Sequence, residues 1–285
     1  MIHRTLATAL AVAFAALAAP APAQAAISVT LERDASGLFD SFEYFQDFDT
    51  LASSNGSSNV AWSNDATIDG WSLFDSAKVA KTFYRAGNGS DAGGYFYSYG
   101  QNGDSDRALG ALGSGGAYWG SPASSALSGY AAAAFRNDSG ATIEGVSVFW
   151  DAEQWRVGES NQGSDTLDFR YGFGDSFASV GAWINPGSAF KYNSTVTNAA
   201  STAGFATDGN ANAVLRGGDI ALEWEAGQTL WITWIDYNSA GFDHGLAIDN
   251  VSLSVAIPAV PEPTSIALLA AGLGIVGAVA RRKRA

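Results

Sequence analysis

The 285-residue chain contains no cysteine, a single methionine and only two histidines. Without cysteine it can form no disulfide, and cysteine nucleophiles and cysteine-based zinc sites are excluded as well. His3 lies in an apolar N-terminal segment, which leaves His244 as the one histidine available to a folded domain. Stability therefore has to come from apolar burial and from any ions that the domain binds.

Positive charge is also scarce, with 15 Lys and Arg against 28 Asp and Glu. The two terminal segments described below hold five of these bases and one acid, which leaves 27 acids and 10 bases between them. Nucleic acid is excluded as a partner, because binding its phosphates requires a basic surface. A surface this acidic is typical of high solubility, of calcium binding, or of both.

The first 26 residues have the three parts of a secretory signal peptide. A basic start at His3 and Arg4 precedes an apolar run over 6–19, and Ala23-Gln24-Ala25 forms a small-x-small cleavage site. We expect signal peptidase to cut after residue 25 or 26, so that the rest of the chain is exported.

The last 27 residues, 259–285, combine a short motif, an apolar span and a basic stop. Val260-Pro261-Glu262-Pro263 is followed by the uncharged stretch Ser265–Ala280 and then by Arg281, Arg282, Lys283 and Arg284. The positive-inside rule places this basic cluster in the cytoplasm and everything upstream outside. A helix over the apolar stretch would be about 24 Å long, short of the roughly 30 Å bilayer core. Such a marginal span suits temporary retention in the inner membrane.

This tail resembles the PEP-CTERM sorting signal of Gram-negative exported proteins. The resemblance implies that an exosortase, a membrane cysteine protease, cuts near Pro261-Glu262-Pro263. It also implies delivery to the cell surface or the extracellular matrix. Proteins with this signal accompany the production of exopolysaccharide. A permanent C-terminal membrane anchor is the plainer alternative.

Between the termini, residues 27–258 are expected to form one β-sandwich domain. Apolar residues recur with a period of two, most clearly over Thr142–Val157 and Gly227–Tyr237, and no segment has the pattern of a capped amphipathic helix. The alternation changes phase at Asp249-Asn250, which predicts a β-bulge. Many strands joined by polar turns indicate an all-β, jelly-roll-like β-sandwich. Further strands are expected over Ser28–Glu32, Phe42–Phe48, Ile68–Phe74, Ala77–Arg85, Tyr95–Gly100, Tyr130–Arg136, Thr166–Phe173, Asp219–Trp224 and 246–255.

Three segments, 97–110, 153–156 and 231–252, together resemble a β-sandwich module of bacterial surface and secreted proteins. That resemblance implies no established activity. The third segment also suggests a calcium site, because oxygen ligands on a glycine-containing loop suit this ion. The candidate ligands are Asp236, Asn238, Asp243, Asp249 and Asn250. The spacing is not that of an EF-hand, since Ala247 stands where the bidentate Glu belongs. The alternative is that these residues only close a turn and a bulge.

The sequence offers little for catalysis, and we expect no catalytic residues. His244 could join Asp243 or Asp249 in a triad, but no Gly-x-Ser-x-Gly elbow is present, and a hydrogen-bonded loop histidine is the simpler interpretation. A carboxylate-dependent glycan hydrolase remains an alternative. Its carboxylates would be Glu153 with Asp168, or Glu223 with Glu225, although Glu153 could equally pair with Arg156 or Arg136.

Binding is the more plausible active role. The chain has nine tryptophans, and aromatic faces beside polar side chains suit sugar rings. Most of these tryptophans are expected in the core, including Trp231 and Trp234. Tyr118, Trp119 and Trp155 are the candidates for exposure and ligand binding. The sequence thus predicts a structural or adhesive surface protein linked to exopolysaccharide, with a calcium-stabilised carbohydrate-binding module as the alternative.

Overall fold

The computed structural model describes residues 26–33, 39–53, 56–159, 163–197 and 203–258. Residues 1–25 of the predicted signal peptide and the whole sorting tail lie outside these residues, as does the expected C-terminal helix. Within them the only helical elements are the 3₁₀ turns η1 (Ala117–Trp119), η2 (Phe177–Ser179), η3 (Ser188–Phe190) and η4 (Asn210–Asn212). No helix in this part of the chain has the length and apolarity to cross a membrane.

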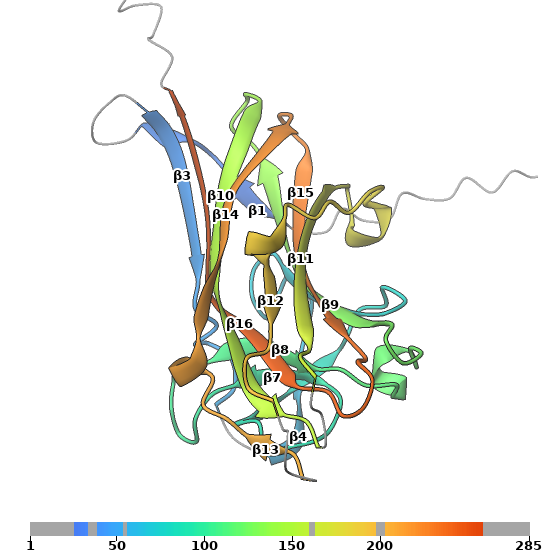
Figure 1. Ribbon diagram of the computed structural model, residues 1–285. Helices are drawn as coiled ribbons and strands as arrows, with labels where there is room; N and C mark the ends of the chain where they lie inside the picture. The colour runs from blue at the N-terminus through green and yellow to red at the C-terminus, as the bar shows by residue number, and fades with distance from the viewer. Residues whose placement is uncertain (1–25, 34–38, 54–55, 160–162, 198–202, 259–285) are drawn as a thin grey trace, which may run out of the picture.

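The strands form two sheets that pack face to face (Figure 1). Sheet A has six strands, ordered β1-β9-β15-β11-β12, with β5 also paired to β9. Their bounds are β1 Ile27–Val29, β5 Trp71–Asp75, β9 Leu127–Asn137, β11 Thr166–Phe173, β12 Lys191–Asn193 and β15 Thr229–Tyr237. Strand β15 lies between β9 and β11, so both of its edges are paired. This is the central position that its apolar residues on both faces predict.

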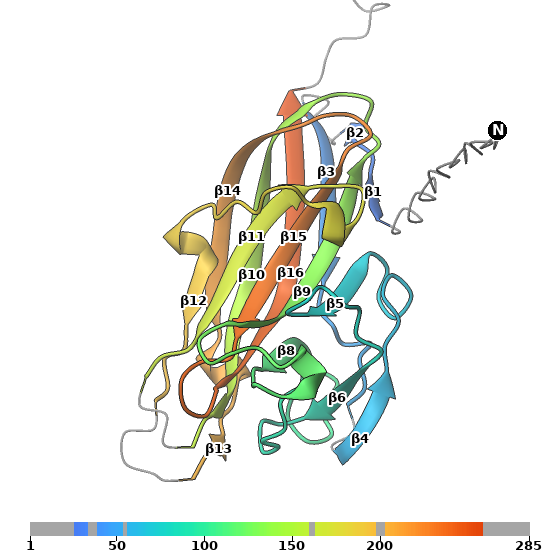
Figure 2. The same ribbon diagram turned by 90° about the vertical axis from the view of Figure 1, so that its right-hand side faces the viewer.

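Sheet B has ten strands and is built around β10 and β16. Strand β10 pairs with β16 on one edge and with β14 and β13 on the other, while β16 pairs with β3 and β8. Figure 2 shows β4, β6 and β8 beside β5 at one end of the molecule. The bounds are β2 Glu32–Arg33, β3 Phe39–Gln46, β4 Gly56–Ala61, β6 Phe83–Gly87, β7 Phe96–Tyr99, β8 Ala108–Leu112, β10 Ile143–Val157, β13 Phe205–Ala206, β14 Val214–Trp224 and β16 Gly245–Pro258.

The main core lies between the sheets and is rich in aromatic rings. Trp234 of β15 stacks on Trp71 at 5.5 Å and meets Trp150 of β10 edge-on at the same centroid distance. Phe169 packs against both Trp150 and Trp234. Large buried rings supply the apolar area that a domain without disulfides needs. The predicted all-β, jelly-roll-like β-sandwich is confirmed.

The β-bulge predicted at Asp249-Asn250 is also present. Phe149 of β10 pairs with Ser252, but the next pair is Asp151 with Asp249, so two residues of β16 oppose one of β10. Asn250 has a φ of 49°, a left-handed conformation that Asn tolerates better than most residues. The bulge changes which side chains of β16 face outward: Asp249 does so before it, and Ser252 and Ser254 after it.

The outer face of sheet B is covered at one end and open at the other. The lower end, where β16 begins, carries a second small core of Tyr97, Tyr99, Ala108, Leu112, Trp155 and Ala247. Towards the upper end, where β16 finishes, Phe45 is 59% exposed and Phe149 is 37% exposed. We call this open region, made by β3, residues 251–258 of β16, residues 143–151 of β10, and β14, the upper outer face.

Candidate functional site

The aromatic residues expected to bind a ligand are not at the surface. Trp119 and Trp155 are fully buried, so the expected exposure of both is wrong. Glycine makes room for the Trp119 ring inside the domain, because a Cβ on Gly129 would stand 2.3 Å from that ring. Trp155 lies nearly parallel to the Tyr99 ring, with centroids 6.1 Å apart, and its Nε1 donates to Glu153.

Tyr118 is half-buried, and its side chain makes its contacts within the domain. Its hydroxyl donates to the carbonyl of Phe83 at 2.6 Å, and the ammonium of Lys81 lies 4.4 Å from its ring centroid. Phe83 and Tyr95 also pack against the ring. These contacts occupy the ring and the hydroxyl that a sugar would need, so Tyr118, like the two tryptophans, has a structural role.

Two of the five predicted calcium ligands lie together in a buried acidic cluster. Asp236, near the end of β15, and Asp243, in the loop that follows, each keep one carboxylate oxygen without a hydrogen-bond partner. Burial, with repulsion from the neighbouring Asp165, raises the pKa of Asp243 to about 8. Burial and the charges of Asp243 and Asp165 raise the pKa of Asp236 well above its usual range. Buried oxygens without partners are uncommon and often mark an unseen water or ion.

The other three predicted ligands have partners elsewhere. Asn238 donates to the carbonyls of Pro122 and Ala123. Asp249 and Asn250 lie on β16, where Asn250 donates to Asp151 of the adjacent strand. The structure therefore does not bring the five residues together. Among the described residues, no group of three or more Asp, Glu, His or Cys side chains is placed to hold a metal ion.

Calcium binding stays a prediction. The part of the predicted site that can still be tested is the pair Asp236 and Asp243. If the pair holds the ion, 5 mM calcium should raise the Tm of the mature protein, and Asp243→Asn should abolish the rise. Differential scanning calorimetry with calcium and with chelator measures this, and Asp138→Asn, at an exposed turn, is the matched control. Equal Tm values in calcium and chelator would refute the calcium prediction.

His244 is held by the backbone on both sides of its ring. Its Nδ1 accepts the N–H of Gly158 at 3.0 Å, and its Nε2 lies 3.1 Å from the carbonyl of Gly163. A carbonyl can only accept, so Nε2 carries the proton and the imidazole is neutral. Because both nitrogens are engaged, the ring has no free atom with which to activate a serine. The hydrogen-bonded loop histidine is the interpretation that this geometry supports.

The carboxylate pairs considered for glycan hydrolysis are not assembled as expected. Glu153 lies on β10 of sheet B, whereas Asp168 lies on β11 of sheet A and accepts from the hydroxyl of Tyr237. Glu223 and Glu225 are both exposed, and Glu225 lies beyond the end of β14. Arg156 donates to the carbonyls of Gly89 and Ser90, and Arg136 pairs with Asp138, so neither arginine partners Glu153.

The structure instead places Glu153 near Asp249, a pairing that the sequence did not reveal. Both lie on the outer side of sheet B, are under 5% exposed, and occupy diagonal positions on β10 and β16. Burial raises the pKa of Glu153 to about 7 and that of Asp249 to about 8, and the charge of Glu153 contributes to the second shift. The change of phase at the bulge was the one sequence signal that could have put Asp249 on this face.

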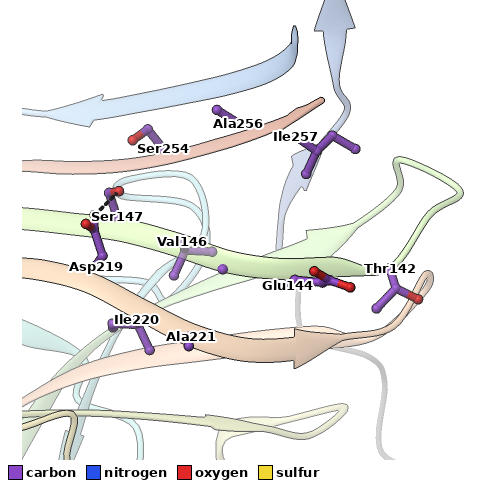
Figure 3. A pocket seen from close by; sticks show the side chains of 11 residues that line it. Thr142, Glu144, Val146, Ser147, Asp219, Ile220, Ala221, Ser254, Ala256 and Ile257 are labelled. Carbon is purple, nitrogen blue, oxygen red and sulfur yellow. Dashed lines mark hydrogen bonds between the residues drawn. The ribbon is translucent and has the colours of Figure 1, made fainter. Parts of the chain in front are cut away.

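The upper outer face carries a groove of about 550 Å³ (Figure 3). Its floor is made by small side chains, among them Ala221 and Ala256, and by Gly145. A polar row crosses it through register partners on four strands: Glu43, Ser254, Ser147 and Asp219. Ser147 donates to Asp219 at 2.5 Å. Long-range strand pairing alone creates this row, and no local sequence pattern indicates it.

A second row of residues, which contains two phenylalanines and is called the aromatic row, runs beside the polar row. Its register partners are Phe45, Ser252, Phe149 and Gly217. Ser252 and Gly217 are small, so their side chains leave the phenyl rings of Phe45 and Phe149 accessible. Within the upper outer face, none of the described outward positions on these four strands carries Lys, Arg or His. The upper outer face thus combines exposed rings, hydroxyl groups and carboxylates, but no cation.

Comparison with known proteins identifies the tail. No curated protein matches the chain. Residues 259–284 match the PEP-CTERM protein-sorting motif, which confirms the interpretation of Val260–Pro263, the apolar stretch and the basic end as one signal. This chain is therefore an exported β-sandwich protein that carries a PEP-CTERM motif, the sorting signal of exosortase substrates.

Proposed function

We propose that the protein is a non-catalytic structural or adhesive component of the cell surface or extracellular matrix, linked to exopolysaccharide. The observation that carries this proposal is that the last strand of the sandwich leads directly into the sorting motif. Strand β16 ends at Pro258, and the sorting motif begins at the next residue. The strands of the sandwich span residues 27–258, so the sandwich itself is the cargo. The surface of this sandwich is what the signal delivers to the destination.

Its maturation would proceed in two cuts. Signal peptidase removes the leader, the tail holds the folded sandwich at the inner membrane, and an exosortase then releases it for display. The geometry of the candidate catalytic groups supports a non-catalytic role. His244 has both nitrogens engaged, and the side chain of Glu153 is buried beside Trp155. A hydrolase based on Glu153 remains an alternative; it would require glycan turnover that Glu153→Gln abolishes.

Replacing Pro261, Glu262 and Pro263 together with alanine is expected to block processing. The full-length protein should then accumulate in the inner-membrane fraction, because the apolar span and the basic stop remain while the motif is lost. Immunoblots of membrane, surface and medium fractions measure this, and Thr264→Ala, just outside the motif, serves as the control. Normal release of the triple variant would contradict exosortase sorting through this motif.

A further inference from the structure

We infer that the upper outer face of sheet B binds an uncharged polysaccharide chain laid across its strands, an inference that rests on the proposed function and names the ligand class. The aromatic row and the polar row supply the two kinds of contact that a sugar chain makes. Apolar faces of pyranose rings pack on Phe45 and Phe149, and sugar hydroxyls bond to Ser147, Ser254 and Asp219.

The spacing of the rows suits an extended ligand. Phe45 and Phe149 flank β16, so their backbones are separated by two strand spacings, about 10 Å. The polar row lies two residues further along each strand, about 7 Å away. A chain lying over the rings therefore has hydroxyl and carboxylate partners along one side, and the small residues of the groove let it approach the sheet closely.

The position of the exposed Phe149 ring within the sheet distinguishes it from an ordinary surface residue. Phe149 lies on β10, which is paired on both edges, so the ring stands on the interior of a sheet surface rather than at a rim. Leu215, which is 64% exposed, extends the same surface beyond Gly217. Single exposed apolar side chains need no explanation, but three of them on one sheet face, Phe45, Phe149 and Leu215, single out that face as a candidate interaction surface.

Charge decides which ligand the face accepts. Its ionisable groups that face outward or line the groove, Glu43, Glu144, Asp151 and Asp219, are all acidic. Anionic polysaccharides and phosphate-bearing polymers are repelled, whereas the hydroxyls of a neutral chain can donate to the carboxylates and to the serine oxygens. Two copies of this chain joined face to face would oppose like charges, so self-association through this face is disfavoured.

The test is affinity electrophoresis of the mature protein in gels containing single polysaccharides. The probes are dextran, mannan, hydroxyethyl cellulose, the neutral fraction of the host's extracellular polysaccharide, and alginate as the anionic probe. We expect at least one neutral probe, and not alginate, to retard the protein. Phe45→Ala/Phe149→Ala should weaken binding about tenfold or more, since two ring contacts are lost. Ala256→Trp, which fills the groove, should weaken it similarly.

Phe242→Ala is the matched control, because Phe242 is 58% exposed but lies in the loop before β16, away from this face. It should bind like the wild type, and circular dichroism should show every variant folded. The inference is overturned if no neutral probe retards the protein, if alginate retards it as strongly, or if the double alanine variant binds normally. A dimer seen in sedimentation and lost in the double variant would assign the face to a second copy instead. Correct sorting without polysaccharide binding would defeat this inference alone and leave the sorting assignment intact.

Discussion

Raising the pH from 4 to 9 should lower the free energy of unfolding of the mature protein by several kcal/mol. The groups responsible are Glu153 and Asp249, buried near each other on the outer side of sheet B. Burial and neighbouring carboxylates raise the pKa of Glu153 from 4.5 to about 7 and that of Asp249 from 3.8 to about 8. Each pKa unit corresponds to about 1.4 kcal/mol, and mutual coupling keeps the total below the sum of the two shifts.

The sign follows from proton binding. Between about pH 4 and pH 8 the folded protein binds more protons at these groups than the unfolded chain does, so stability falls as the pH rises. The stabilising contribution is complete below the unfolded pKa values and is lost as the pH passes the folded ones. Asp236 and Asp243 act in the same direction, since burial raises the pKa of each. The protein should therefore be most stable in mildly acidic solution.

Urea denaturation at pH 4, 5, 7 and 9 in the presence of chelator measures this dependence, because the chelator removes any contribution of calcium at Asp236 and Asp243. The double variant Glu153→Gln/Asp249→Asn, which keeps the shapes but removes the titrating groups, should show a much flatter profile. Asp138→Asn, at an exposed turn, should leave the slope unchanged. A free energy of unfolding that rises between pH 5 and pH 9 would contradict the prediction.

Truncating Trp234 to alanine should destabilise the domain by about 3–5 kcal/mol. The ring is 1% exposed and stands where the two sheets meet, stacked on Trp71 and edge-on to Trp150. Its removal leaves a cavity that these rigid rings cannot close by small movements. The midpoint of urea denaturation and the Tm both report the loss.

Phe45→Ala is the control for this truncation. It also removes an aromatic ring from a strand, but one that is 59% exposed, so a change within about 0.5 kcal/mol is expected. If the two variants were equally destabilised, the central role of the Trp71–Trp150–Trp234 contacts would be wrong. The comparison also shows whether the double variant used for polysaccharide binding keeps the stability of the wild type.

Features that depend only on residues adjacent in the sequence could be predicted from it. The sorting tail is a linear signal, so its motif, apolar span and basic stop are visible without any fold. Alternation with a period of two indicates strands because successive side chains point to opposite faces. The change of phase at Asp249-Asn250 indicated the bulge for the same reason, and the bulge is present.

Exposure could not be predicted in this way, because it depends on what packs over a residue. Trp155 lies near the end of a strand that the sequence predicted well, yet the segment that contains Gly209 lies against its ring, and the indole is buried. Trp119 is buried through glycines that accommodate its ring from distant parts of the chain. A glycine-rich loop around an aromatic residue is compatible with display and with burial, and only the tertiary packing distinguishes them.

The sequence by itself determined that this is an acidic, disulfide-free, all-β protein with a PEP-CTERM signal, because composition, periodicity and linear motifs are local properties. Only the tertiary structure decided which side chains share a surface. Strand register joins Phe45 to Phe149 through Ser252, places Glu153 diagonally beside Asp249, and separates Asp236 from Asp249. Pairing between strands 100 residues apart in the chain leaves no local trace in the sequence, and the candidate binding face and the titrating pair are both products of that pairing.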